Sequence, residues 1–247
     1  MEFLAEVQSV SFWHGLLLII WVNIILSGDN AVVIALAARS LPPQQQNKAI
    51  MWGAGAAVVL RILLTIVAVK LLTLPYLKII GGLLLFWIAI GLLVPEDGGE
   101  DVDGSDNLFQ AIKTILIADL VMSVDNVIAV AGVAKGSVIL LILGLTISIP
   151  LVIFGATILM KLMERFPVII TAGAGILGWV AGEMLVTDPS VVDGIKENMG
   201  WMHLHTPIGD ISWAQIVGVV IVIVVGKWLA ARKENSAETV VEIKQEN

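Results

Sequence analysis

Two Asp-Asn pairs stand inside long apolar stretches of this sequence, where charged side chains are uncommon. The first pair is Asp29-Asn30 and the second is Asp125-Asn126. A carboxylate at the centre of a bilayer costs about 2.5–3.5 kcal/mol on insertion scales, and such residues usually line a bundle interior or an ion path. Carboxylate, carbonyl and water oxygens are the ligands that suit Mg²⁺, Ca²⁺ and Mn²⁺. The two pairs therefore predict a site for a divalent cation within a membrane.

Two further polar residues precede each pair at the same spacing, so that the two stretches match at an offset of 96 residues. The matched positions, all of which we include in the candidate metal site, are Asn23 with Asp119, Ser27 with Ser123, Asp29 with Asp125 and Asn30 with Asn126. In an unbroken helix the residues at i, i+4 and i+7 share a stripe, and the two aspartates lie about 120° away from it. Either the carboxylates and the stripe face different neighbours, or the helix is locally unwound and frees backbone carbonyls for a cation.

A different interpretation of the aspartates stays open. Each could cap a helix at a turn near the membrane surface, and Gly28 and Asn30 suit such a turn in the first stretch. The repetition of the pattern favours the intramembrane site, because two unrelated surface turns would not be expected to share four spaced polar positions.

Arg61 is the basic residue that lies deepest in an apolar stretch, in the run GAGAAVVLRILLT. It could pair with Asp29, Asp119 or Asp125 and so lower the cost of burying each charge. It could instead extend along the apolar surface toward the headgroups. Its place about halfway along its stretch favours the role of charge partner.

Other polar clusters give weaker signals. His203 and His205 form an i, i+2 pair beside Asp210 that resembles a weak metal site. Glu183 stands close to the end of its apolar stretch and is a minor candidate. The acidic run between residues 96 and 106 lacks the ligand spacing of a calcium loop, and a solvated charge run is the better interpretation.

Composition requires that lipid be the solvent for most of the chain. Of its 247 residues 58% are hydrophobic and 14% are charged, whereas a soluble domain has about 25% charged residues. Cysteine is absent, which excludes disulfides and thiolate metal sites. No basic stripe with interleaved aromatics is present, so nucleic acid is not an expected partner. Neither an HExxH motif nor a base beside a nucleophile occurs, so we expect no enzyme, no catalytic residue and no permanently bound cofactor.

Hydrophobic runs of about 20 residues predict seven transmembrane helices and an all-α polytopic membrane bundle. They span roughly residues 12–38, 49–72, 75–94, 108–133, 137–160, 167–187 and 212–230. Between the sixth and seventh runs lies a longer loop, residues 188–211. A charged tail, residues 232–247, follows the last run. We interpret the whole chain, residues 1–247, as a single transmembrane domain.

The first three predicted helices repeat as the next three. Beyond the matched polar positions, an offset of 92 places Pro75 on Pro167, Gly81 on Gly173 and Trp87 on Trp179. Repeat 1 covers about 12–94 and repeat 2 about 108–187, with the helix at about 212–230 as an addition. Because each repeat has three spans, the second enters the membrane in the opposite direction. Inverted repeats of this kind are common in secondary transporters, whose binding sites lie near the midplane.

Lys and Arg residues predict the orientation. Nine of them fall on one side of the predicted spans and four on the other, and the richer side is expected to be cytoplasmic. This places the N-terminus outside and the C-terminus in the cytoplasm of a bacterial inner membrane. The N-terminal residues MEFLAEVQSV carry acids where a secretory signal would be basic, which favours a retained first span.

These motifs resemble those of the TerC family of integral membrane proteins. The resemblance rests on SGDNAVVIALAAR (27–39), ADLVMSVDNVIAVAG (118–132), the stretch with Arg61, and GGLLLFWIAIGLL (81–93). It implies a seven-span fold and membrane handling of metal ions, chiefly manganese efflux. Carried over by motif, it implies Asp29, Asn30, Asp125 and Asn126 as metal-site residues. Val124 replaces Gly28 in the second motif, so the two halves of the site need not be equivalent.

Two functions follow as hypotheses. The first is a transporter of divalent metal ions, with Mn²⁺ favoured and proton coupling as a further hypothesis because buried carboxylates also serve as proton relays. The second is a membrane accessory protein that delivers metal to proteins being translocated. The expected partners are the lipid bilayer and a divalent cation, with a homo-oligomer or translocation machinery as further candidates.

Overall fold

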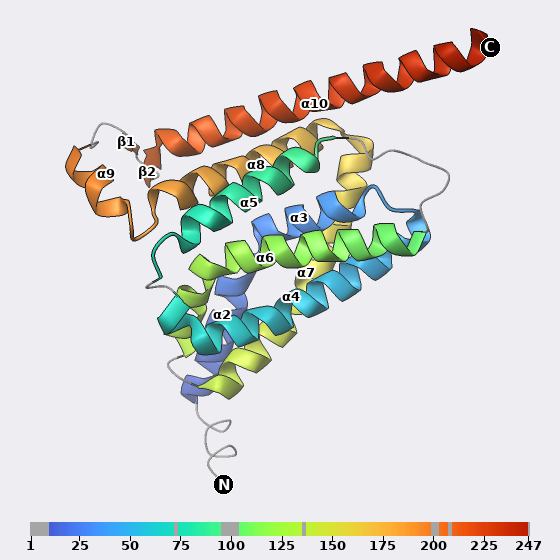
Figure 1. Ribbon diagram of the computed structural model, residues 1–247. Coiled ribbons are helices and arrows are strands. Elements are labelled where there is room, and N and C mark those ends of the chain that lie inside the picture. The colour runs from blue at the N-terminus through green and yellow to red at the C-terminus, as the bar shows by residue number, and fades with distance from the viewer. Residues whose placement is uncertain are drawn as a thin grey trace. The chain divides into compact units, whose positions relative to one another are not determined.

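The computed structural model describes residues 10–71, 74–94, 104–134, 137–198, 203–206 and 209–246, and it confirms the all-α fold class (Figure 1). The helices are α2 (Val10–Leu26), α3 (Gly28–Ala38), α4 (Pro43–Leu71), α5 (Leu77–Gly91), α6 (Gly104–Ala134), α7 (Val138–Arg165), α8 (Val168–Val186), α9 (Val192–Asn198) and α10 (Trp213–Glu246). Strands β1 (His203–Thr206) and β2 (Gly209–Ser212) form an antiparallel hairpin in which His203 lies opposite Ser212.

Most of the predicted spans correspond to helices that can cross a membrane. Within the described residues, five helices are long and apolar enough. Helices α2 and α3 pass the same test only when taken together, as one broken span or a re-entrant loop with a bend of 51°. Helix α5 is apolar but has only 15 residues. At 1.5 Å per residue it is shorter than a hydrocarbon core of about 30 Å. The count of seven spans depends on this helix and stays a prediction.

Two regions contain more regular structure than the sequence predicted. The predicted loop at 188–211 contains α9 and most of the hairpin. Helix α10 does not end near residue 230 but continues through the charged tail to Glu246. The tail contains four Glu and two Lys, which are good helix formers.

The helices group in two compact units, each of which is described by itself. Unit 1 contains α2, α3, α4, α6 and α7, and unit 2 contains α5, α8, α9, the hairpin and α10. The predicted repeats do not coincide with these units. Each repeat instead contributes its first two predicted segments to unit 1 and its third to unit 2. Helices that the sequence matched with each other therefore fall in the same unit.

Unit 1 encloses the half-helix α3. Every residue of α3 from Asn30 to Ala38 is buried. The small and branched side chains of this helix allow α6 and α7 to pack closely against it. A separate cluster joins Phe12, Leu16 and Ile19 of α2 to residues of α4, α6 and α7. The first Asp-Asn pair thus stands at the N-terminal end of an enclosed helix.

Unit 2 is held together by close backbone contacts between α8 and α10, which lie alongside each other in Figure 1. A Cβ added to Gly178 would lie 2.6 Å from the carbonyl oxygen of Gly218, and one added to Gly218 would meet the carbonyl of Gly178. A Cβ added to Gly182 would likewise meet the carbonyl oxygen of Ala214. Small residues four apart on facing helices allow this approach, as is usual for helix packing in membranes.

Asp188 caps the N-terminus of α5 from the segment that follows α8. Its carboxylate accepts hydrogen bonds from the backbone N–H groups of Tyr76 (3.0 Å), Lys78 (3.0 Å) and Ile79 (3.4 Å), and it also accepts from the N–H and hydroxyl of Ser190. Burial alone would raise the pKa of this carboxyl, but these hydrogen bonds outweigh it and lower the pKa to about 2. From the sequence, Asp188 was expected only to begin the loop at residues 188–211.

We therefore expect Asp188→Asn to destabilise the protein by about 1–2 kcal/mol, because the amide keeps only one of the two acceptor oxygens and loses the negative charge at the helix N-terminus. An unfolded Asp has a pKa of about 3.9. Because the folded pKa is lower, the stabilisation is complete above about pH 4 and is lost as the pH falls through about 2. Thermal unfolding in detergent between pH 7 and pH 2 measures it. The difference in Tm between the wild type and Asp188→Asn should decrease below pH 4. The Tm of the exposed variant Asp193→Asn should follow that of the wild type at every pH. A difference in Tm that stays constant down to pH 2 would contradict the role of the Asp188 carboxylate as the cap of α5.

Candidate functional site

The first Asp-Asn pair lies at a break between two helices. Helix α2 ends at Leu26, Ser27 adopts φ −105° and ψ 5°, and α3 begins at Gly28. A Ser-Gly pair is a common cause of a sharp kink. Asp29 accepts a hydrogen bond of 2.8 Å from the N–H of Asn30 in the first turn of α3, where a negative charge is favourable.

The second pair lies in a continuous helix. Helix α6 runs from Gly104 to Ala134 through Asp125 and Asn126 without a break. Local unwinding, one of the two alternatives for these motifs, therefore occurs in the first half and not in the second. The sequence difference that accompanies it is Gly28 in the first motif and Val124 in the second.

The asparagines of the two motifs meet at the break. The carbonyl oxygen of Leu26 accepts from the Asn30 side-chain amide at 3.3 Å and from the Asn126 side-chain amide at 3.2 Å. Since α2 ends there, this carbonyl has no helical partner of its own. The two repeats thus share one backbone oxygen at the place where the sequence predicted a joint site.

Arg61 of α4 lies at the centre of a buried polar network. Its Nη2 forms an ion pair of 2.5 Å with Asp119 Oδ1. Its Nη1 donates to Asn23 Oδ1 at 2.8 Å and to Ser27 Oγ at 3.2 Å, and its Nε donates to Ser123 Oγ at 3.0 Å. The exposed fraction of each of these five residues is 7% or less. We call the four acceptor residues the Arg61 pocket.

Further hydrogen bonds extend this network to neighbouring helices. Ser123 donates to Asp119 Oδ2 at 3.1 Å, and the Asn23 amide donates to Ser148 of α7 at 2.5 Å. Thr65 donates to the Arg61 carbonyl at 2.7 Å. Sequence reasoning missed Ser148. The signal that could have found it is the pair of hydroxyl residues, Thr146 and Ser148, just before Pro150 in a long apolar run.

A small cavity of about 20 Å³ adjoins the network. Its polar lining comes from Asn23, Ser27, Asn30, Arg61 and Asp119. The Oδ1 of Asn30 is buried there without a hydrogen-bond partner among the described residues. A cavity of this size can hold one water molecule or one bare ion.

The two aspartates of the motifs differ in what the structure describes. Asp29 is half-buried and lies close enough to Arg61 and Asp119 for their charges to act on it. Asp125 lies in α6, but its side chain is outside the described residues. Among the side chains that are described, no group of three or more His, Cys, Asp or Glu could hold a metal ion. The structure therefore brings together Asn23, Ser27, Asp119 and Ser123 around Arg61, and the predicted metal site stays a prediction.

The weaker candidates are not part of this network. Glu183 is exposed and accepts a 3.0 Å hydrogen bond from the Gln215 side chain. The side chains of His203, His205 and Asp210 lie outside the described residues. The same is true of the acidic side chains between residues 96 and 106.

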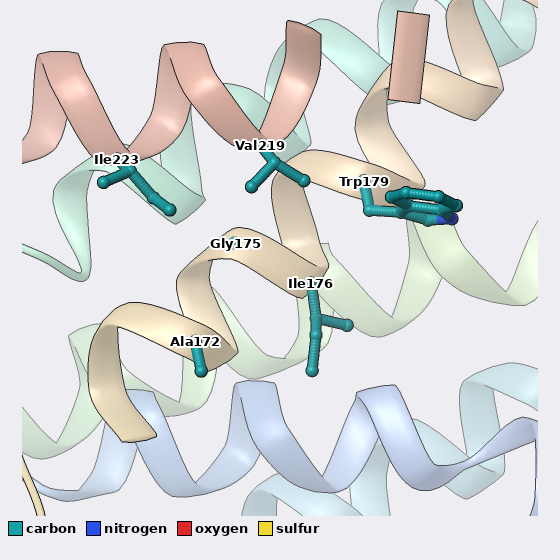
Figure 2. Close-up of a pocket in the computed structure, with 6 residues that line it drawn as sticks. All are labelled: Ala172, Gly175, Ile176, Trp179, Val219 and Ile223. Atoms are coloured by element: carbon teal, nitrogen blue, oxygen red, sulfur yellow. The ribbon is translucent and has the colours of Figure 1, made fainter. Parts of the chain in front are cut away.

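A larger pocket in unit 2 has a different chemistry. It measures about 420 Å³ and lies between α8 and α10, with the Trp179 ring at one end (Figure 2). It is lined by Ala172, Gly175, Ile176, Trp179, Val219 and Ile223. This lining contains no charged group and no oxygen-bearing side chain, so it offers a cation no side-chain ligand.

Comparisons with known proteins agree with the motifs. The TerC integral membrane protein family matches residues 8–235. The membrane protein YjbE of Bacillus subtilis (strain 168) is 44% identical over 174 residues, which cover 70% of this chain and 80% of YjbE. The membrane protein YceF of the same strain is 26% identical over 170 residues, 65% of this chain and 66% of YceF.

A third relative is longer than the region it shares. The UPF0053 inner membrane protein YoaE of Escherichia coli (strain K12) is 31% identical over 155 residues, 55% of this chain but 29% of YoaE. No solved structure matches the chain. The family match over most of the sequence and the apolar helices agree, and the chain belongs to the TerC family of integral membrane proteins.

Proposed function

We propose that this protein transports divalent metal ions across the bacterial cytoplasmic membrane, exporting Mn²⁺ in exchange for protons. The observation that carries the proposal is the break between α2 and α3. It places Asp29, Asn30 and the Leu26 carbonyl beside a buried charge network in apolar helices. Broken helices serve transporters in this way, because their unwound carbonyls replace the hydration shell of a cation.

The chemistry of the donors supports a hard cation. Around the break the donors are amide, hydroxyl, carboxylate and backbone oxygens. Such oxygens suit Mn²⁺, Mg²⁺ and Ca²⁺, whereas Zn²⁺ and Cu⁺ are better held by imidazole or thiolate. The chain has no cysteine, and its three histidines lie outside the centres of the predicted spans. The proposed ligands are Asp29, Asn30, Asp125 and Asn126.

The proposed orientation puts the N-terminus outside and the C-terminus in the cytoplasm. The excess of Lys and Arg on the C-terminal side of the predicted spans supports it. Lys227, Arg232 and Lys233, at the end of the apolar part of α10, belong to that side. A homo-oligomer is compatible with the proposal but is not needed for it.

Metal flux in proteoliposomes tests the proposal. We expect Asp125→Asn and Asp29→Asn to lower Mn²⁺ flux by about tenfold or more, the usual effect of disturbing a metal site. Asp193→Asn, an exposed carboxylate on α9, is the matched control and should transport like the wild type. If Asp125→Asn leaves Mn²⁺ flux unchanged, the proposed site is wrong.

A deletion strain distinguishes transport from the accessory role. Export predicts that cells without the protein accumulate manganese and become sensitive to it. Delivery of metal to translocated proteins predicts a normal manganese content together with inactive secreted metalloenzymes. In vitro, an accessory protein would bind Mn²⁺ but show little sustained flux alone.

A further inference from the structure

The guanidinium of Arg61 lies among several oxygen atoms and not beside a single partner. The Arg61 pocket supplies one carboxylate, one amide and two hydroxyl oxygens, at 2.5 to 3.2 Å from the guanidinium nitrogens. These acceptors come from α2, from the break after it and from α6. Oxygens of these kinds that converge on one positive charge form the arrangement in which proteins bind small, hard cations.

A second observation points to a ligand at the same place. Asn30 is 4% exposed, its Oδ1 has no partner among the described residues, and it lines the cavity beside Arg61. A carbonyl oxygen can be satisfied only by a hydrogen-bond donor or by a cation. With about 20 Å³ beside the guanidinium, the space admits a water molecule or a bare ion but not a hydrated one.

Electrostatic repulsion prevents the Arg61 guanidinium and a free cation from occupying the pocket at the same time. Arg61 and Asp119 together are neutral, and the single charge of Asp29 nearby would not balance a divalent cation added beside them, so a net positive charge would remain in a buried, apolar region. Two like charges a few ångströms apart repel strongly where the dielectric is low. If the guanidinium leaves, the carboxylate of Asp119 and the neighbouring oxygens lose their only positive partner among the described residues.

We propose that Arg61 is a tethered cation that occupies a pocket for a small, hard metal cation. The pocket of Asn23, Ser27, Asp119 and Ser123, with Asn30 Oδ1, binds a free cation only when the guanidinium is out of it. This inference rests on the proposed function and deepens it. It names the residue that competes with the transported ion.

The test measures whether removing the arginine creates a cation requirement. Full-length wild type, Arg61→Ala and Arg61→Ala/Asp119→Ala are purified in detergent, and their unfolding temperatures are measured with and without MnCl₂. N-methylglucamine chloride at equal ionic strength controls for salt. We expect MnCl₂ well above its Kd to raise the Tm of Arg61→Ala by about 5–10 °C more than that of the wild type. The double variant should lose this additional rise.

Either of two results would overturn the proposal. One is a folded Arg61→Ala protein that gains no more from MnCl₂ than the wild type does. The other is a gain that persists in Arg61→Ala/Asp119→Ala, since the cation would then bind elsewhere. If Arg61→Ala is not recovered folded, Arg61→Gln removes the charge while keeping much of the length, and the same comparison with its Asp119→Ala double variant applies.

A further variant separates this inference from the proposed function. In Arg61→Ala/Asp125→Asn the additional stabilisation should remain, because it depends on Asp119. Loss of Mn²⁺ flux in Asp125→Asn with retention of this stabilisation supports both. Unchanged flux in Asp125→Asn overturns the proposed transport site alone.

Discussion

Replacing Asp119 by alanine while Arg61 remains should destabilise the protein by about 3–5 kcal/mol. The two side chains form a buried ion pair of 2.5 Å with exposed fractions of 4% and 8%. Truncation leaves the guanidinium with hydroxyl and amide acceptors but without its ion-pair partner among the described residues. The missing hydrogen bond from Ser123 adds a smaller loss.

Removing both charges should restore most of this stability. In Arg61→Met/Asp119→Leu no uncompensated charge remains, and replacing a buried pair by apolar side chains of similar volume is often neutral or stabilising. Unfolding of the purified proteins, followed by circular dichroism in increasing denaturing detergent, gives the comparison, with Asp193→Ala as the exposed control. If Asp119→Ala unfolds at the same detergent concentration as the wild type, the ion pair does not contribute to the stability of the fold. If the double variant is as unstable as Asp119→Ala, the charge explanation fails.

A methyl group added at the α8–α10 contact should have the second large effect. The Cβ of Gly218→Ala would meet the carbonyl of Gly178, closer than any ordinary Cβ contact. Backbone atoms cannot rotate away as a side chain can, so the two helices must separate. Overpacking of this kind costs about 1–3 kcal/mol and occasionally more.

The matched control is Gly91→Ala in α5 of the same unit. A Cβ at Gly91 would have no neighbouring atom within 4 Å among the residues that the structure describes. The same substitution should therefore be neutral or slightly stabilising, because alanine is the better helix former. Thermal unfolding of the two variants in detergent is the measurement. Equal Tm values for Gly218→Ala and Gly91→Ala would show that the α8–α10 backbone contact does not limit stability.

Stability and transport should separate between the two sites. Gly218 belongs to unit 2, whereas the residues of the Arg61 pocket belong to unit 1. Asp119→Ala changes the pocket directly. Flux measured at a temperature where both variants remain folded should therefore fall more in Asp119→Ala.

The polar positions of the site were predictable because lipid offers no hydrogen-bond partners, so polar side chains in apolar helices have to face the protein interior. Asn23, Ser27, Asp119, Ser123 and Arg61 are polar residues in apolar runs, and their helical spacing predicts a shared face. Burial of such groups requires partners, and the sequence predicted four of them as parts of a metal site with Arg61 as a charge partner. The structure has these five in one network.

Which partners meet was not predictable in the same way. Arg61 could have paired with Asp29, Asp119 or Asp125, since all lie in apolar runs. The packing of α4 against α6 decides for Asp119. Similarly, Gly28 allowed a break in the first motif, but only tertiary packing shows that Asn30 and Asn126 share the Leu26 carbonyl there.

The sequence by itself determined that the chain lies in lipid, that its fold is all-α, which family it belongs to and which polar residues lie in apolar helices. Hydrophobic length, periodicity and short motifs are local properties of the chain, so they can be read without the tertiary structure. It did not determine the grouping of the helices into two units, the cap of α5 by Asp188, or the contact of Gly178 with Gly218. These depend on residues that lie 40 or more positions apart, and many apolar faces could in principle pack together. The tertiary structure selected one arrangement, in which buried polar groups find partners and the small residues face each other.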